Sequence, residues 1–181
     1  MVRARMVELN RHAEERRDKE DGQADAIAAL ANLVAGRRPG VYLWGETGRG
    51  KSWLADRAVM AAWDRGIPSL CIREREFLQA ATGAARGDGG WCDQLIAAAR
   101  SVSLLCLDEF GRTRRITEVQ QDALDQLVDD RMDPRLRTIV VTNIDREHLA
   151  ADTCRGATLA SRIVGLCGPP VFIDGPDWRH G

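Results

Sequence analysis

Apolar residues along this chain fall into short, nearly continuous runs separated by longer segments of helical periodicity. The runs span residues 41–44, 69–72, 102–107, 138–142 and 171–173. Runs of this length are typical of strands that a parallel sheet buries on both faces. Because they alternate with helical segments along the chain, the pattern predicts an α/β fold with a mainly parallel, five-stranded sheet.

The segments between the runs carry helix signals. Helices are predicted over residues 23–35, 52–65 and 91–100 and around Phe77 and Leu78. A further helical region is predicted after Asn143, and it continues through about residue 165. Glycines from Gly83 to Gly90 predict a loop, and Thr117 and Gln120 have the spacing of a capping box that opens a further helix ending near Asp133 and Pro134. Two apolar stripes are expected to face the core: Ile27, Leu30, Leu33 and Val34 in the first helix, and Ile116, Val119, Ala123, Leu127 and Val128 in the capped helix.

The length and composition indicate one well-packed domain. The chain has 181 residues, of which 44% are hydrophobic, and its net charge is -1. We expect residues 1–22, which are rich in both charges, to form an arm or helix, and residues 23–181 to form the domain. A near-neutral chain carries no overall basic field, so any contact with nucleic acid must come from local patches.

The cysteines and the apolar segments indicate a cytoplasmic location. The five cysteines include no C-x-x-C pair, which makes zinc and redox sites weak interpretations. Cys71 and Cys106 lie in strand-like runs and are expected to be core residues, a use of cysteine that suits a reducing compartment. The charged N-terminus is not a secretory signal, and the apolar stretch 26–35 is too short to span a bilayer.

A phosphate-binding loop follows the first predicted strand. Residues 45–52 fit the pattern G-x-x-x-x-G-K-[ST], and Trp53 continues into a helical segment. Glycines let the backbone N–H groups converge on phosphates, and the helix N-terminus adds its dipole. We therefore expect ATP to bind at Gly45, Glu46, Thr47, Gly48, Arg49, Gly50, Lys51, Ser52 and Trp53, with Lys51 at the β- and γ-phosphates and Ser52 as a ligand of Mg²⁺.

Polar residues at the ends of two other strands complete the expected site. Asp108 and Glu109 end the third run, and Asn143 ends the fourth. The carboxyl ends of parallel strands meet at one edge of a sheet, where ligands bind. We expect Asp108 to hold Mg²⁺ through water, Glu109 to polarise the attacking water, and Asn143 to hydrogen-bond the water and the γ-phosphate. A turn-forming role for Asn143 is the alternative.

The ordered set of motifs resembles the AAA+ ATPases of the bacterial helicase-loader group and the related ATPases of insertion-sequence transposition (DnaC/IstB-like). The resemblance runs from about residue 23 to the end of the chain. The segments that carry it are the phosphate-binding loop, residues 104–111, the helix from Thr117 to Arg131, the strand before Asn143, Ser161-Arg162-Ile163, and residues 175–179. It implies a three-layer P-loop domain without a sizeable separate lid, and an arginine finger at Arg162 that reaches a neighbouring subunit's ATP.

The resemblance also implies a function. Members of this group hydrolyse ATP with Mg²⁺, form ATP-dependent homo-oligomers, bind single-stranded DNA and deliver the replicative helicase to DNA. This chain departs from the group in having only about forty residues, mostly charged or helical, before the first strand, and in lacking a strong basic stripe. Its best local patch is Arg112, Arg114 and Arg115, which either contacts DNA or a neighbour or is a solvated loop paired with Glu118.

Three other functions fit part of the pattern. An accessory ATPase of transposition has nearly the same motifs and differs in its partner, a transposase. A small-metabolite kinase shares the P-loop but needs an acceptor site and a lid that excludes water. The water-activating carboxylate expected at Glu109 favours hydrolysis over transfer. A nucleotide-gated adaptor would bind ATP without turning it over.

Overall fold

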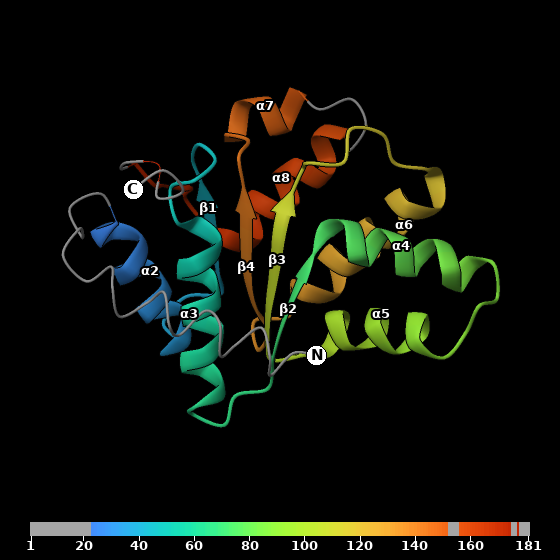
Figure 1. Ribbon diagram of the computed structural model, residues 1–181, viewed down its shortest axis with the longest axis horizontal. Helices are drawn as coiled ribbons and strands as arrows, with labels where there is room; N and C mark the ends of the chain where they lie inside the picture. Colours follow the sequence, from blue (N-terminus) through green and yellow to red (C-terminus); the bar gives the residue numbers. More distant parts are fainter. Residues whose placement is uncertain (1–22, 152–155, 175–176, 178–181) are drawn as a thin grey trace.

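The computed structural model describes residues 23–151, 156–174 and 177, so the arm predicted over residues 1–22 lies outside the described part. Five strands form one sheet in the order β2-β3-β4-β1-β5, and every neighbouring pair is parallel (Figure 1). The strands are β1 Gly40–Trp44, β2 Ser69–Arg73, β3 Leu104–Phe110, β4 Arg137–Thr142 and β5 Val171–Phe172. The predicted five-stranded parallel sheet is confirmed.

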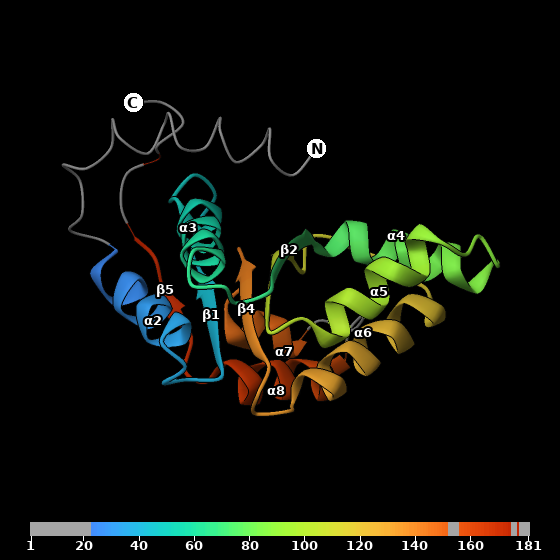
Figure 2. The ribbon, with the colours of Figure 1, turned by 90° about the horizontal axis from the view of Figure 1, so that it is seen from below.

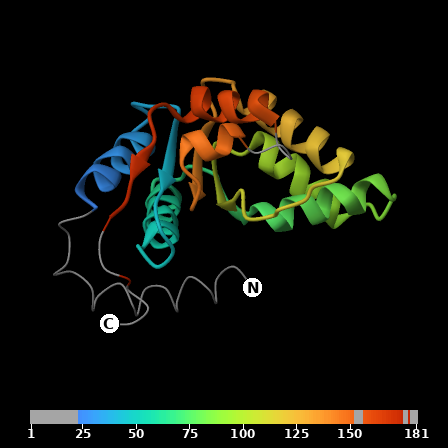
Figure 3. The ribbon, with the colours of Figure 1, turned by 90° about the horizontal axis from the view of Figure 1, so that it is seen from above.

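Helices cover both faces of the sheet. They are α2 Ala24–Val34, α3 Lys51–Trp63, α4 Glu74–Ala85, α5 Trp91–Ser101, α6 Glu118–Arg131, α7 Arg146–Ala151 and α8 Gly156–Cys167. Figures 2 and 3 show α3 and α8 on opposite faces, with α2 beside α3 and with α4, α5 and α6 gathered toward the β2 edge. The described residues thus form a three-layer domain, and no separate lid is found among them.

Two apolar clusters hold the layers together. One joins α2 and α3 to side chains such as Val41 and Ile139 on one face of the sheet. The other cluster packs the five helices from α4 through α8 against the opposite face of the sheet, which includes Tyr42 and Val140. Neighbouring residues of one strand therefore enter different clusters, which explains why the strands read as continuous apolar runs.

Two predicted stripe residues point away from the core. Ile27 is 42% exposed and Val119 is 44% exposed. In α6 the residues that face the core are spaced at i, i+3, i+4 and i+7, namely Leu124, Leu127, Val128 and Arg131. The predicted stripes were wrong at Ile27 and Val119 because helix rotation is set by the closest packing to the sheet, which the apolar pattern alone does not fix.

Three local expectations also need correction. Gly83 lies inside α4, where a Cβ would sit 2.6 Å from the Cys92 sulfur, so a close approach of α4 and α5 requires glycine there. Cys106 is buried as expected, but Cys71 is exposed because β2 is an edge strand. The third strand begins two residues late, at Leu104, and continues through Asp108 and Glu109 to Phe110.

The helices also bear on the question of membrane insertion. Among the residues that the structure describes, no helix combines the length and the apolar character that crossing a bilayer requires.

Candidate nucleotide site

Three strand ends meet at one edge of the sheet. β4 lies between β1 and β3, so the segments that follow these three strands surround a single cleft of about 420 Å³. The cleft is lined by most of the residues that the motifs identified, including Thr47, Gly48, Gly50, Lys51, Ser52, Trp53, Asp108, Glu109 and Asn143. The structure therefore brings together the expected phosphate, metal and water-activating groups.

The loop after β1 has the geometry of an anion site. Gly45, Gly48 and Gly50 have φ values of 150°, 88° and 82°, which side-chain-bearing residues rarely adopt. Gly50 is the N-cap of α3, so the helix begins at Lys51 with its free N–H groups directed at the loop. A Cβ on Gly45 would collide with the carbonyl oxygen of Ile173. Glycine is therefore required here by packing as well as by backbone conformation.

Lys51 is held inside this loop. Its side chain is buried, at 6% exposure. Its ammonium group donates to the carbonyl oxygens of Gly45 (2.8 Å) and Glu46 (2.6 Å). Beside it, Arg49 pairs with Glu46 at 2.5 Å. The ammonium group is thus fixed at the mouth of the loop, where phosphate oxygens could replace the carbonyl acceptors.

Asp108 and Ser52 form the part of the site suited to a metal. The Ser52 hydroxyl donates to the Asp108 carboxylate at 3.0 Å, and the Glu109 N–H donates to the same oxygen at 2.8 Å. Burial raises the pKa of Asp108, and the hydrogen bonds from Glu109 and Ser52 oppose the shift. A hydroxyl and a carboxylate oxygen this close match the hard oxygen ligands that Mg²⁺ prefers, so the donor set fits the expected ion.

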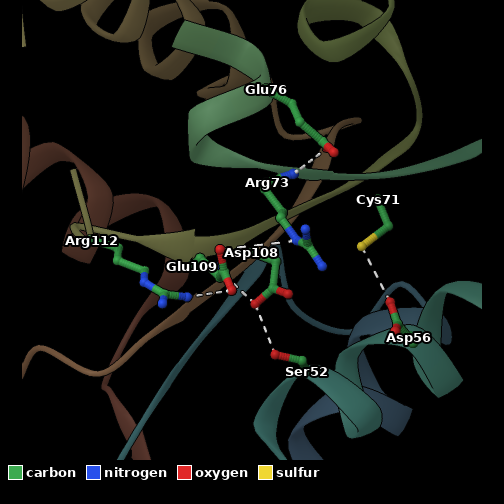
Figure 4. A network of polar contacts seen from close by, with 8 residues as sticks. All are labelled: Ser52, Asp56, Cys71, Arg73, Glu76, Asp108, Glu109 and Arg112. Atoms are coloured by element: carbon green, nitrogen blue, oxygen red, sulfur yellow. Dashed lines mark hydrogen bonds and ion pairs between the residues drawn. The ribbon is translucent and has the colours of Figure 1, made fainter. Parts of the chain in front are cut away.

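Glu109 is turned toward the cleft by an unusual backbone. Its φ is 55°, and it is the one non-glycine residue with positive φ among those described. The register of β3 with β4 shifts between Leu107 and Phe110, so a bulge lies at this position. Figure 4 shows the side chain lying between two arginines: Arg112 Nη1 is 2.7 Å from Oε1, and Arg73 Nε is 4.0 Å from Oε2.

Asn143 lies across the cleft from the carboxylates. Its side-chain amide donates to the Thr47 hydroxyl at 3.0 Å, which ties the end of β4 to the phosphate-binding loop. The preceding residue, Thr142, donates to the Phe110 carbonyl at 2.6 Å and so joins the ends of β4 and β3. The Tyr42 hydroxyl donates to the Ile144 carbonyl at 2.8 Å, and burial raises the pKa of this hydroxyl. Each contact fixes where Asn143 points.

Arg162 is the one expected catalytic residue that the fold keeps away from the cleft. It lies on α8 and pairs with Asp129 at 2.9 Å and with Asp125 at 4.0 Å, both on α6. It is absent from the residues that line the cleft. An arginine finger that acts on a neighbouring subunit has to lie outside its own site, and this position meets that requirement.

Sequence reasoning missed two residues that shape the site. Glu74 is fully buried, and its carboxylate accepts the N–H groups of Gly111 (3.2 Å) and Thr113 (3.4 Å). Arg73, at the end of β2, extends toward Glu109. Both lie in the run Arg73-Glu74-Arg75-Glu76, which has the appearance of a solvated helix start. Only the strand order, which places β2 beside β3, reveals their role.

Comparison of the sequence with known proteins finds a distant relative. No protein-family model matches the chain. The curated replicative helicase loader DnaI of Bacillus subtilis is 21% identical over 155 residues, which cover 80% of this chain and 49% of that protein. The chain thus spans about half the length of the curated relative that it matches.

Solved structures agree with this result. A crystal structure of DnaI superposes with a TM-score of 0.73 at 25% identity, covering 88% of this chain and 85% of that one. A crystal structure of the DnaC helicase loader gives 0.71 at 20% identity, covering 86% and 92%. AMPPCP-bound DnaA of Aquifex aeolicus gives 0.72 at 21% identity, covering 88% and 49%. These findings confirm the α/β P-loop fold of the AAA+ type and the resemblance to the helicase-loader group.

Proposed function

We propose that this chain is a Mg²⁺-dependent ATPase that acts in DNA replication as a helicase loader, working as an ATP-dependent oligomer on single-stranded DNA. The observation that carries the proposal is the convergence of Lys51, Asp108, Glu109 and Asn143 on one cleft. The similarity to DnaI and DnaC supports the biological role. The AMPPCP bound to a DnaA structure of the same fold supports ATP as the nucleotide.

Each group in the cleft has a role in hydrolysis that follows from its position. Lys51 would exchange the carbonyls of Gly45 and Glu46 for β- and γ-phosphate oxygens. Asn143, now bound to Thr47, would hydrogen-bond the γ-phosphate and the attacking water. Glu109 would accept the proton of that water as the general base. Ser52 and Asp108 would hold Mg²⁺, which neutralises charge on the phosphates when bound.

Completion of the site by a neighbouring subunit is supported by the location of Arg162. The residue is exposed on α8, and its ion pairs with Asp125 and Asp129 involve partly exposed groups. Exposed ion pairs contribute little free energy, so the guanidinium group is readily transferred to another acceptor. An arginine supplied in trans stabilises transition-state charge and raises the rate of hydrolysis strongly. Turnover by one subunit would therefore depend on assembly.

The test is ATP turnover per subunit, measured against protein concentration with and without single-stranded DNA. Turnover that rises with both would support a site completed between subunits. Turnover that is independent of both would argue for a self-contained site and would favour the kinase or a partner-activated ATPase. Co-precipitation with the replicative helicase, and separately with a transposase, would then distinguish loading from transposition.

A further inference from the structure

The carboxylate of Glu109, the proposed water-activating group, forms an ion pair with the guanidinium group of Arg112. Arg112, in the loop that follows β3, donates from Nη1 to Oε1 of Glu109, near the end of that strand, at 2.7 Å (Figure 4). A carboxylate that accepts a charge-assisted hydrogen bond has less electron density to offer a water proton. The described conformation of Glu109 is therefore a poor general base until the Arg112–Glu109 ion pair opens.

The backbone around Arg112 is held in place by the buried residue Glu74. Glu74 is fully buried, and its two carboxylate oxygens accept the N–H groups of Gly111 and Thr113, the residues on either side of Arg112. Gly111 has a φ of 81°, a conformation that favours glycine, and it lies against the Ile144 side chain. The backbone is thus clamped on both sides of Arg112, while the arginine side chain remains 72% exposed.

The same loop presents a concentrated positive charge. Arg112, Arg114 and Arg115 are exposed within four residues, which we call the basic loop. No acidic residue lies between Glu109 and Glu118 in the sequence. Arginine guanidinium groups match phosphate oxygens in geometry, and a strand of phosphates can engage several of them at once. The basic loop therefore fits a phosphodiester backbone, and Arg112 can bind either a phosphate or Glu109.

We propose that the Arg112–Glu109 ion pair holds the resting subunit inactive, and that a single-stranded DNA backbone bound to the basic loop removes Arg112 from Glu109 and permits hydrolysis. This inference rests on the proposed ATPase function. It gives a direct route from DNA to the chemistry, because the DNA ligand and the general base compete for one guanidinium group. By linkage, opening the ion pair must in turn favour DNA binding.

The first experiment compares turnover of wild type, Arg112→Ala and Arg112→Lys with and without an oligothymidylate. Removing the guanidinium should raise DNA-free turnover severalfold, up to about fivefold, because an exposed ion pair of this kind holds the carboxylate only weakly. The response to DNA should fall toward none. Lysine, which keeps the charge but not the planar fork, should lie between alanine and wild type. The matched control is Arg135→Ala, which removes an exposed arginine paired with Asp133 at the opposite end of β4 and should leave both rates unchanged.

Two results would overturn the inhibitory ion pair. One is an Arg112→Ala variant whose basal rate and DNA response equal those of wild type. The other is an Arg112→Ala variant that binds ATP but has lost turnover, which would make Arg112 a group that catalysis needs. Raised basal turnover of Arg112→Ala, together with a wild type whose turnover no oligonucleotide stimulates, would overturn DNA as the releasing ligand and would favour an acidic protein segment.

The second experiment measures binding directly and does not depend on hydrolysis. The anisotropy of a labelled oligothymidylate is titrated with wild type and with the Arg114→Ala/Arg115→Ala variant at several salt concentrations. Each lost phosphate contact should reduce the slope of log affinity against log salt by about 0.7. An unchanged affinity and slope would exclude the basic loop as the DNA surface. If wild type hydrolysed no ATP under any condition, the proposed function would fail, and this measurement would still decide whether the loop binds DNA.

Discussion

At the carboxyl end of β3, two adjacent acidic residues have different surroundings. The carboxylate of Asp108 accepts hydrogen bonds from the Ser52 hydroxyl and the Glu109 N–H. The carboxylate of Glu109 is turned away by a left-handed backbone and meets Arg112. A non-glycine residue in this conformation costs about 1–3 kcal/mol, which surrounding structure has to offset. These different surroundings suit Asp108 to the role of metal ligand and Glu109 to the role of general base that we propose for them.

Replacing Asp108 with Asn should stabilise the metal-free protein at neutral pH. Burial raises the pKa of Asp108, so folding favours its protonated form. That contribution to stability is present at low pH and is lost as the pH rises through the raised pKa. At neutral pH the buried charge therefore costs free energy, and an amide removes it. Thermal unfolding in a chelator should show a higher Tm for Asp108→Asn at pH 7, with a difference that shrinks on acidification.

Asp133 provides the matched control for this experiment. Its side chain is 28% exposed, and the hydrogen bonds from Arg135 lower the pKa of its carboxyl to about 2. The sign of the linkage is reversed, because this carboxylate contributes stability above its usual pKa range and loses it as the pH falls. Asp133→Asn should therefore give no increase in Tm at pH 7. An Asp108→Asn protein less stable than wild type at pH 7 would contradict the burial argument.

Replacing Glu109 with Gln should separate ATP binding from hydrolysis. Glutamine keeps the shape of the side chain but cannot accept a proton, so single-turnover hydrolysis should fall by about 10²–10⁴-fold while ATP affinity stays near that of wild type. Lys51→Ala should instead lose ATP binding, since the ammonium group at the mouth of the loop is removed. Rapid hydrolysis by Glu109→Gln would show that another group activates water.

At the scale of elements, the sequence predicted the five strands and the capping box of α6, because both signals are local. Thr117 and Gln120 bond each other's backbone N–H groups as the spacing implied. It did not predict the outward positions of Ile27 and Val119, or the exposure of Cys71, since these depend on how helices rotate and on which strand lies at the edge. The contact between Glu74 and the loop after β3 joins residues 37 and 39 positions apart, so no local pattern contains it.

Arg131 is a charged side chain in the core that connects several elements of the fold. It closes α6, is 1% exposed, and donates to Thr138 Oγ1 and to the carbonyls of Ala99, Val102 and Arg137. Burial lowers its pKa to about 10, so it stays protonated at neutral pH. These hydrogen bonds join the ends of α5 and α6 to the start of β4.

Arg131→Met should therefore destabilise the domain, because methionine replaces the unbranched stem of arginine but not its guanidinium group. Methionine leaves buried carbonyl acceptors without donors, at an expected cost of about 2–4 kcal/mol in the free energy of unfolding. Urea denaturation followed by circular dichroism would measure it. Arg135→Met is the control, because Arg135 is exposed and should change stability by less than about 0.5 kcal/mol. Equal stability of Arg131→Met and wild type would mean that water satisfies these acceptors.

At the scale of the whole molecule, the proposed active site exceeds one subunit. The cleft holds Lys51, Asp108, Glu109 and Asn143, whereas Arg162 lies on α8 against α6. The motifs in the sequence identified the residues of the cleft, and the family resemblance implied that Arg162 acts on a neighbouring subunit. The fold agrees with that expectation, because it places Arg162 outside the cleft of its own chain. The functional unit we propose is therefore the contact between two copies.

Mixing two inactive variants tests that unit. Lys51→Ala should fail to bind ATP, and Arg162→Ala should bind ATP with the affinity of wild type but lose turnover. In an equal mixture, some interfaces join the intact cleft of an Arg162→Ala subunit to the arginine of a Lys51→Ala subunit, so part of the turnover should return. Wild-type turnover by Arg162→Ala alone would exclude the trans assignment, and a mixture that stays inactive would argue against a shared site.

The short strand β5 determines when the nucleotide site can mature during synthesis. The Ile173 N–H donates to the Trp44 carbonyl at 2.8 Å, and the Ile173 carbonyl fills the space that a Cβ on Gly45 would need. The segment that supports the phosphate-binding loop is therefore translated after the other four strands. A nascent chain that has not yet released residue 173 from the ribosome lacks the support behind Gly45. Nucleotide can consequently meet the finished loop only after residue 173 has left the ribosome, which limits binding by chains that have not reached that point.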